Sequence, residues 1–229
     1  MHAGGWSVVG PLLPGFGPEI RTLPGRKHSE WRDAIQAAVA EARASHGRVV
    51  LVGHSLGATM ALLAAERERV DAQVLLAPYW RFGGPIRSAL WPILRLWAGR
   101  WKPLGKANFD DERIRSGVLR MLPDLDLDDQ AAREELRRFT IPTGLLDELR
   151  RAGGAAKKAA ARSTAKTLIV QGLRDGLVQP KDTEALLMSI KGSRLELLDA
   201  THNLTSPNDG AWGRVTRAVL GFLDEQSPS

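Results

Sequence analysis

Val49-Val50-Leu51-Val52-Gly53-His54-Ser55-Leu56-Gly57 is an apolar run that ends in a glycine-flanked serine, and the alanine-rich run 58–66 follows it directly. The first run predicts a buried strand and the second predicts a helix. A strand, a sharp turn and a helix with serine at the apex define a nucleophile elbow. Gly53 and Gly57 are expected to let the strand and the helix approach closely, because neither carries a Cβ. The pattern therefore predicts a reactive Ser55 at a strand end.

Four short apolar runs with helical patterns between them predict an α/β fold, in which a mostly parallel sheet is flanked by helices. The predicted strands are 48–52, 73–77, 167–171 and 194–198, and a further short strand is predicted at 6–11. The strand pattern stops between Tyr79 and Ser163, where charged helical patterns cover 110–122, 128–138 and 143–151. We therefore expect a core of residues 1–78 and 164–229 with a helical cap inserted at 79–163. Residues 153–165 are the most linker-like stretch of the chain, and 154–161 could equally form a poorly packed helix.

The length of 229 residues suits a core with an inserted subdomain. The absence of cysteine excludes a disulfide framework, thiolate chemistry and cysteine-based metal sites. The chain starts without a basic segment followed by a long apolar one, and it has no uncharged apolar stretch of about 18 residues that would span a bilayer. These features predict a cytoplasmic protein.

A serine hydroxyl needs a neighbouring base, and that base needs a carboxylate to orient it. Of the five histidines, His202 lies in the loop after a predicted strand, where α/β sheets place their sites. Asp175 follows the strand 167–171, which is expected beside the strand that leads to His202. Asp199 is the rival carboxylate because it is close to His202 in sequence. The patterns favour Ser55 as nucleophile, His202 as base and Asp175 as the orienting carboxylate.

The order Ser55, Asp175, His202, with a helical insertion before Asp175, resembles the α/β-hydrolase superfamily. Leu13-Pro14-Gly15-Phe16-Gly17 is similar to the Leu-Pro-Gly-His-Gly loop of its monoacylglycerol lipase and carboxylesterase branch, with Phe16 in place of the histidine. The resemblance implies hydrolysis of medium- or long-chain carboxylic esters through an acyl-enzyme, with a small-molecule ester or lipid as substrate and no metal or cofactor. Thioesterase and acyltransferase chemistry use the same triad and stay open.

Two N–H donors are expected to stabilise the oxyanion of such a reaction, and the sequence supplies only one of them. Leu56 follows the nucleophile, so its N–H is the implied first donor. Members of that branch carry an upstream strand with a His-Gly pair for the second donor, and this part of the sheet is expected to be truncated. Three explanations stay open: the recorded start lies downstream of the true one, Gly15 or Phe16 is the second donor, or the protein binds acyl chains without hydrolysing them.

The segment 80–106 combines tryptophans with arginines and lysines and contains no acidic residue, within a chain of net charge +6. Its apolar residues recur at helical spacing, which predicts a basic amphipathic helix. Trp80, Trp91 and Trp97 are predicted to line an acyl pocket, and the segment to contact a membrane surface peripherally. The alternative is that its tryptophans pack on the core and its arginines are solvated. No nucleic-acid partner is expected, because the motifs of binding modules are missing.

Overall fold

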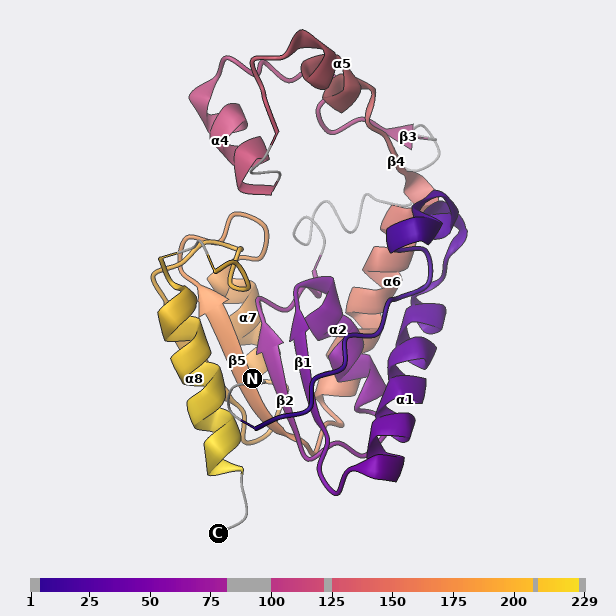
Figure 1. Cartoon of the computed structure of the whole chain (residues 1–229), viewed down its shortest axis with the longest axis vertical. Helices are drawn as coiled ribbons and strands as arrows, with labels where there is room; N and C mark the ends of the chain where they lie inside the picture. The colour runs from indigo at the N-terminus through magenta and orange to yellow at the C-terminus, as the bar shows by residue number, and fades with distance from the viewer. Residues whose placement is uncertain (1–4, 82–99, 122–124, 208–209, 227–229) are drawn as a thin grey trace. The chain divides into compact units, whose positions relative to one another are not determined.

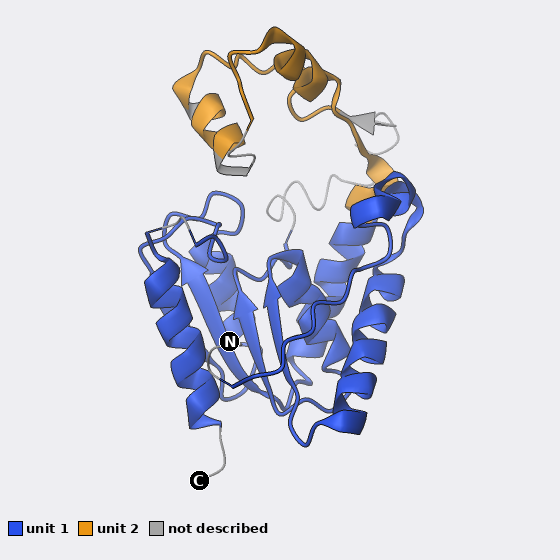
Figure 2. Ribbon diagram, in the orientation of Figure 1, with its two compact units in different colours: residues 1–84, 148–229 blue, residues 85–147 orange. Residues whose placement is uncertain are grey.

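The computed structural model of the chain describes residues 5–81, 100–121, 125–207 and 210–226 (Figure 1). The chain divides into two compact units, one made of residues 1–84 and 148–229 and the other of residues 85–147 (Figure 2). Helix α6 (Thr143–Ala160) belongs to both, since its residues from 148 onward are part of the first unit. The predicted insertion, 79–163, is therefore longer at both ends than the second unit.

The first unit is built on a four-stranded parallel sheet, which confirms the predicted fold class. The strand order is β1 (Val50–His54), β2 (Ala72–Leu76), β5 (Lys166–Gly172) and β6 (Arg194–Leu198). The register pairs His54 with Leu76 and Leu76 with Val170, so the carboxyl ends of the strands lie at one edge of the sheet. The loops that follow β1, β5 and β6 therefore meet at this edge.

Helices cover the sheet because its central strands, β2 and β5, are buried on both faces. They are α1 (His28–Ser45), α2 (Leu56–Ala64), α7 (Pro180–Leu187) and α8 (Trp212–Glu225), and a 3₁₀ helix, η2 (Gly17–Gly25), precedes α1. Val74 and Leu168 pack in one buried cluster with Val215 and Val219 of α8. Side chains alternate along a strand, so the buried Leu75 and Ile169 point to the other face. Burying each such side chain contributes about 1.5–3 kcal/mol.

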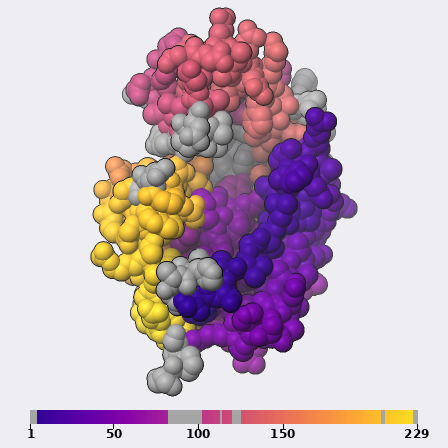
Figure 3. All heavy atoms as spheres, in the orientation of Figure 1, coloured from indigo at the N-terminus to yellow at the C-terminus, as the bar shows by residue number. Residues whose placement is uncertain are grey.

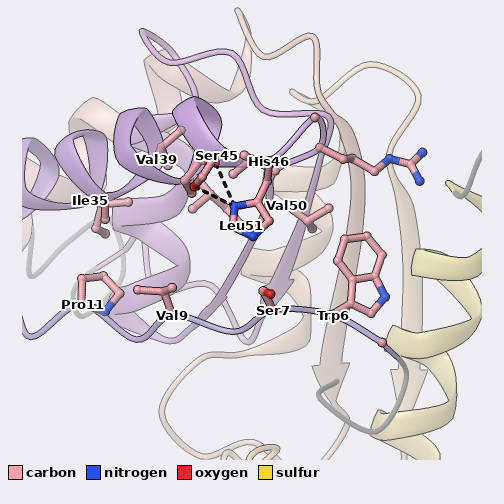
Figure 4. A pocket seen from close by; sticks show the side chains of 16 residues that line it. Trp6, Ser7, Val9, Pro11, Ile35, Val39, Ser45, His46, Val50 and Leu51 are labelled. Carbon is pink, nitrogen blue, oxygen red and sulfur yellow. Dashed lines mark hydrogen bonds between the residues drawn. The ribbon is translucent and has the colours of Figure 1, made fainter.

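The predicted strand at residues 6–11 is wrong, because this segment forms no ladder with the sheet. Gly10 and Pro11 oppose strand pairing, since glycine is flexible and proline has no N–H to donate. The segment runs over the surface of the first unit (Figure 3), and Trp6 packs against the core cluster. It forms a groove of about 530 Å³ with α1 and the start of β1 (Figure 4). This groove lies at the amino end of β1, whereas Ser55 follows its carboxyl end.

Of the two interpretations of residues 153–165, the structure shows the helix, because α6 continues as a regular helix to Ala160. Its small residues are buried rather than solvated: Ala152, Ala156, Ala159 and Ala160 are each 0% exposed. Gly153 explains the close packing, because a Cβ there would lie 2.2 Å from the carbonyl oxygen of Trp80. Alanine and glycine at these positions let this part of the helix pack closely within the first unit.

Two neighbouring glycines of α6 should respond in opposite ways to alanine. Gly153→Ala is expected to lower the free energy of unfolding by about 1–3 kcal/mol, because the new methyl group collides with the Trp80 backbone. Gly154→Ala is expected to raise it by about 0.8–1 kcal/mol, because a Cβ there meets nothing within 4 Å and alanine favours the helix. Urea unfolding of both variants checks this pair, and equal changes in stability would contradict it.

The second unit contains α4 (Glu112–Met121), α5 (Gln130–Arg138) and the short antiparallel pair β3 (Arg100–Trp101) and β4 (Ile141–Pro142). Its buried cluster is formed by Phe109, Val118 and Leu127. Arg115 holds Asp128 with two hydrogen bonds of 2.9 and 2.8 Å, which joins α4 to the loop before α5. The predicted basic amphipathic helix, with Trp91 and Trp97, falls largely on residues 82–99, outside the described residues. In the described part of the chain, every helix is too short or too polar to cross a membrane.

Candidate active site

Ser55 lies at a sharp turn between β1 and α2, with φ 54° and ψ −118°. A residue other than glycine at such angles costs about 1–3 kcal/mol and persists only where its surroundings hold it. A Cβ on Gly53 would lie 2.4 Å from the carbonyl oxygen of Gly57, so only glycine lets the strand and helix approach this closely. The same expectation for Gly57 is wrong, because a Cβ there would meet nothing within 4 Å.

The backbone of Ser55 is held on both sides by hydrogen bonds. Its N–H donates to the carbonyl oxygen of Leu76 at 2.8 Å, and its carbonyl oxygen accepts from the N–H of Tyr79 at 3.2 Å. Both partners belong to β2 or the segment after it, so the neighbouring strand fixes the turn. Leu56 is the first residue of α2, and its N–H therefore has no acceptor within the helix. An N–H at this position is available to a negatively charged oxygen beside Ser55.

Asp175 and His202 are brought together from the loops after β5 and β6. The Nδ1 atom of His202 lies 2.8 Å from Oδ2 of Asp175. Because an ionised carboxylate only accepts, Nδ1 carries the proton and donates it, which leaves Nε2 with the lone pair that a base requires. Asp199, the rival carboxylate, forms an exposed ion pair of 2.8 Å with Arg174.

The side chain of Asp175 is 0% exposed, and its carboxylate has several donors besides His202. Its Oδ1 accepts from the N–H groups of Leu177 at 2.8 Å and Val178 at 2.9 Å. Burial raises the pKa of Asp175, but the hydrogen bonds from His202, Val178 and Leu177 together outweigh it and hold the pKa below its usual range. The group is therefore ionised at neutral pH.

Gln171 is a residue of this site that the sequence reasoning missed. It is fully buried in β5, and its Nε2 donates to Oδ2 of Asp175 at 3.1 Å and to the carbonyl oxygen of Val178 at 3.0 Å. Its Oε1 accepts from the hydroxyl of Thr183 at 2.6 Å. The available signal was an amide near the end of an otherwise apolar strand, shortly before Asp175. Gln171 thus connects the carboxylate to α7.

Replacing Gln171 with leucine is expected to lower kcat about tenfold, the equivalent of one lost hydrogen bond to the carboxylate. It should also lower the free energy of unfolding by about 1–3 kcal/mol, because the hydroxyl of Thr183 and the carbonyl of Val178 lose a buried partner. Ester hydrolysis and urea unfolding measure the two effects. Gln130→Leu, at an exposed position of α5, is the control. A loss of stability with unchanged kcat would leave Gln171 without a role toward Asp175.

The two candidates for the second oxyanion donor are both engaged within their own loop. The N–H of Gly15 donates to Oε2 of Glu19 at 3.2 Å, and the N–H of Phe16 donates to the carbonyl oxygen of Leu13 at 3.0 Å. Trp31 of α1 fixes this loop by donating its indole N–H to the carbonyl of Pro14 at 2.9 Å. Either N–H would have to leave its partner to serve a substrate, so the assignment stays a prediction.

Ser55 and His202 are not joined by a hydrogen bond between their side chains in the part of the chain that the structure describes. In unliganded enzymes this contact is often long and tightens only when substrate binds. The link that the structure does show runs through His54, whose Nε2 lies 2.8 Å from the carbonyl oxygen of His202. The elbow and the loop of His202 are therefore neighbours.

Trp80 is 6% exposed, and its indole N–H donates to the carbonyl oxygen of Asp182 at 2.8 Å. The guanidinium of Arg81 lies 4.6 Å from the centre of the Trp80 ring and pairs with Asp182 at 3.1 Å. These contacts attach the segment after β2 to α7. A role of Trp80 toward a substrate stays a prediction. Among the described residues, no group of three histidine, aspartate or glutamate side chains is arranged to hold a metal ion.

Comparisons with known proteins agree with this fold. The sequence pattern of the Alpha/beta hydrolase family matches residues 2–218. Similar solved structures include one from the study of LipS and LipT, two metagenome-derived lipolytic enzymes, at 20% identity and a TM-score of 0.66, covering 94% of this chain and 80% of that one. A monoacylglycerol lipase of Paleococcus ferrophilus matches at 21% identity and a TM-score of 0.61, with 88% and 77% covered. Est1E from Butyrivibrio proteoclasticus matches at 24% identity and a TM-score of 0.54, with 88% and 71% covered. A search of curated proteins found no match.

Proposed function

The chain belongs to the α/β-hydrolase family, and we propose that it is a serine hydrolase that cleaves carboxylic esters of medium- or long-chain acyl groups. The observation that carries the proposal is the 2.8 Å contact between His202 Nδ1 and Asp175, at the same sheet edge as the strained Ser55. This arrangement supports a base in the required tautomer that acts on a serine at the same edge of the sheet. The residues of the reaction are Ser55, His202, Asp175 and Leu56.

In the proposed reaction, the hydroxyl oxygen of Ser55 attacks the ester carbonyl while its proton passes to Nε2 of His202. The N–H of Leu56 donates to the oxyanion, and the ionised Asp175 stabilises the imidazolium of His202. The bond to the alcohol then breaks, and His202 returns the proton to the leaving oxygen. Water repeats these steps on the acyl-enzyme, which releases the acid and restores Ser55.

The substrate class rests on the proteins that this chain is similar to. Lipolytic enzymes and a monoacylglycerol lipase are among the similar structures. We extend this to a small-molecule ester or lipid as substrate here. We also keep the proposal that the basic, tryptophan-rich segment 80–106 contacts a lipid surface, because tryptophan with arginine and lysine around apolar residues suits that boundary.

Nitrophenyl esters from acetyl to palmitoyl, together with a fluorophosphonate probe, test this function. We expect covalent labelling of Ser55, located by mass spectrometry, and hydrolysis that favours medium or long acyl chains. Activity restricted to acetyl esters would contradict the substrate class. Preference for acyl thioesters, or acyl transfer to an alcohol in place of water, would favour the thioesterase or acyltransferase alternative.

A second candidate function, acyl binding without turnover, has one observation in its favour. The N–H groups of Gly15 and Phe16 are both engaged, so the second oxyanion donor has no free source among them. Losing one such donor costs about 2.7–4 kcal/mol in the transition state, or about a hundred- to a thousandfold in turnover. Fatty-acid binding by a protein that neither labels nor hydrolyses any ester of the series would support this candidate.

A further inference from the structure

His54, the residue directly before Ser55, contacts His202 through both its hydrogen bonding and its ring. Its Nε2 lies 2.8 Å from the carbonyl oxygen of His202, and the two ring centres are 4.8 Å apart with their planes tilted by 43°. His54 ends β1, whereas His202 follows β6, and the sheet order places β2 and β5 between these strands. The contact therefore joins the end of β1 to the loop after β6, two parts of the chain that are not neighbours in the sheet.

The hydrogen bond assigns the proton on His54. A carbonyl oxygen only accepts, so Nε2 of His54 carries the proton and donates it. Burial lowers the pKa of His54, as does the neighbouring His202, and these effects outweigh the carbonyl of His202 and the charge of Asp175, which raise it. His54 is therefore neutral at neutral pH. A neutral ring adds no second positive charge beside His202 when that residue takes the proton of the serine.

The loop of His202 is also anchored on its other side. The N–H of Arg174 donates to the carbonyl oxygen of Ala200 at 2.9 Å, which ties the loop to the segment that carries Asp175. A Cβ on Gly172 would lie 2.5 Å from the carbonyl oxygen of Thr201, so glycine is required for this close approach. These contacts fix the loop relative to the carboxylate, but none of them fixes it relative to Ser55. The bond from His54 supplies that connection.

We propose that His54 is a positioning residue that holds the backbone of His202 at the distance from Ser55 that proton transfer requires. This inference rests on the proposed function. Asp175 sets the rotation and tautomer of the imidazole, whereas His54 sets the place of the main chain that carries it. His54 is not an alternative base, because its Nε2 proton is committed to the carbonyl of His202.

A matched pair of substitutions separates positioning from packing. Gln and Met are similar in length and unbranched, but only Gln keeps an N–H donor. We expect His54→Gln to retain kcat within about threefold, and His54→Met to lose about ten- to a hundredfold in kcat with KM nearly unchanged, since small misplacements of reacting groups cost this much. His46→Leu, an exposed substitution at the end of α1, should behave like the wild type. Equal kcat in the Met variant and the wild type would overturn the proposal, as would equal losses in both His54 variants.

A spectroscopic readout keeps the inference apart from the proposed function. The backbone amide of His202 has its own proton–nitrogen NMR signal, whose position depends on where the main chain of this residue lies. We expect this signal to be kept in His54→Gln and to broaden or shift in His54→Met. If the wild type neither labels nor hydrolyses esters, the proposed function fails, but this signal still tests the positioning. Should the Met variant not fold, His54→Phe retains the ring contact without the donor, and a wild-type signal in it would overturn the inference.

Discussion

Replacing Ser55 with alanine is expected to lower kcat for nitrophenyl esters by about ten-thousandfold or more, because the variant has no oxygen with which to form an acyl-enzyme. In enzymes of this type the nucleophile and its base act as a unit, and removing either costs nearly the whole effect of the triad. The remaining rate would come from direct attack of water on the bound ester. Substrate binding and the N–H of Leu56, which donates to the oxyanion, would still assist that reaction. Initial rates across the ester series, with active-site titration of the wild type, measure the change.

The stability of this variant serves as an internal control. Alanine keeps the Cβ and therefore the backbone strain at φ 54°, and no hydrogen bond of the Ser55 side chain is lost within the described residues. The free energy of unfolding should stay within about 0.5 kcal/mol of the wild type. Ser45→Ala, at the exposed end of α1, should change neither stability nor rate by more than a small amount. A Ser55→Ala variant that keeps a tenth of the wild-type kcat would mean that another group is the nucleophile.

The parts of the fold that the sequence predicted well are those with a local cause. Short runs rich in apolar residues predict β1, β2, β5 and β6, of which the central β2 and β5 are buried on both faces. The glycine-flanked Ser55 predicts the turn to α2. Two segments that the sequence did not settle depend on distant contacts. Residues 6–11 resemble a strand, but pairing needs a partner that local sequence does not specify. The end of α6 resembles a linker, but the close approach of Gly153 to Trp80 makes small residues fit there.

The residues of the candidate site also divide into those that the local sequence locates and those that depend on distant contacts. Asp175 and His202 could be located because the carboxyl ends of parallel strands share one edge, so loops after β5 and β6 must lie together. Gln171 and His54 could not be assigned in this way, because their roles depend on where side chains point across the sheet. The state of the Gly15 N–H could not be predicted either, because it donates to the side chain of Glu19 and no motif specifies that bond.

Asp175→Asn is expected to lower kcat by about a thousand- to ten-thousandfold, because it imposes the wrong tautomer on His202. The N–H groups of Leu177 and Val178 both donate to Oδ1, so they require the oxygen of the new amide at that position. The amide NH₂ then replaces Oδ2 and faces Nδ1 of His202, which must accept. The proton moves to Nε2, where it blocks the acceptance of the serine proton. Ester hydrolysis measures the change, as does the downfield proton NMR signal expected for Nδ1 of His202, which should vanish in this variant.

Asp199→Asn is the matched control, because Asp199 follows β6 and forms an exposed ion pair. This substitution should lower kcat by less than about twofold. The pH dependence of stability gives a second contrast. Because the pKa of Asp175 is lower in the folded protein than in the unfolded chain, its contribution is fully present above the unfolded value of about 3.9 and is lost as the pH falls through the folded one. Asp175→Asn should therefore lose less stability than the wild type on acidification below about pH 4. Equal acid sensitivity of the two proteins would mean that the hydrogen bonds to Asp175 do not lower its pKa in the folded protein.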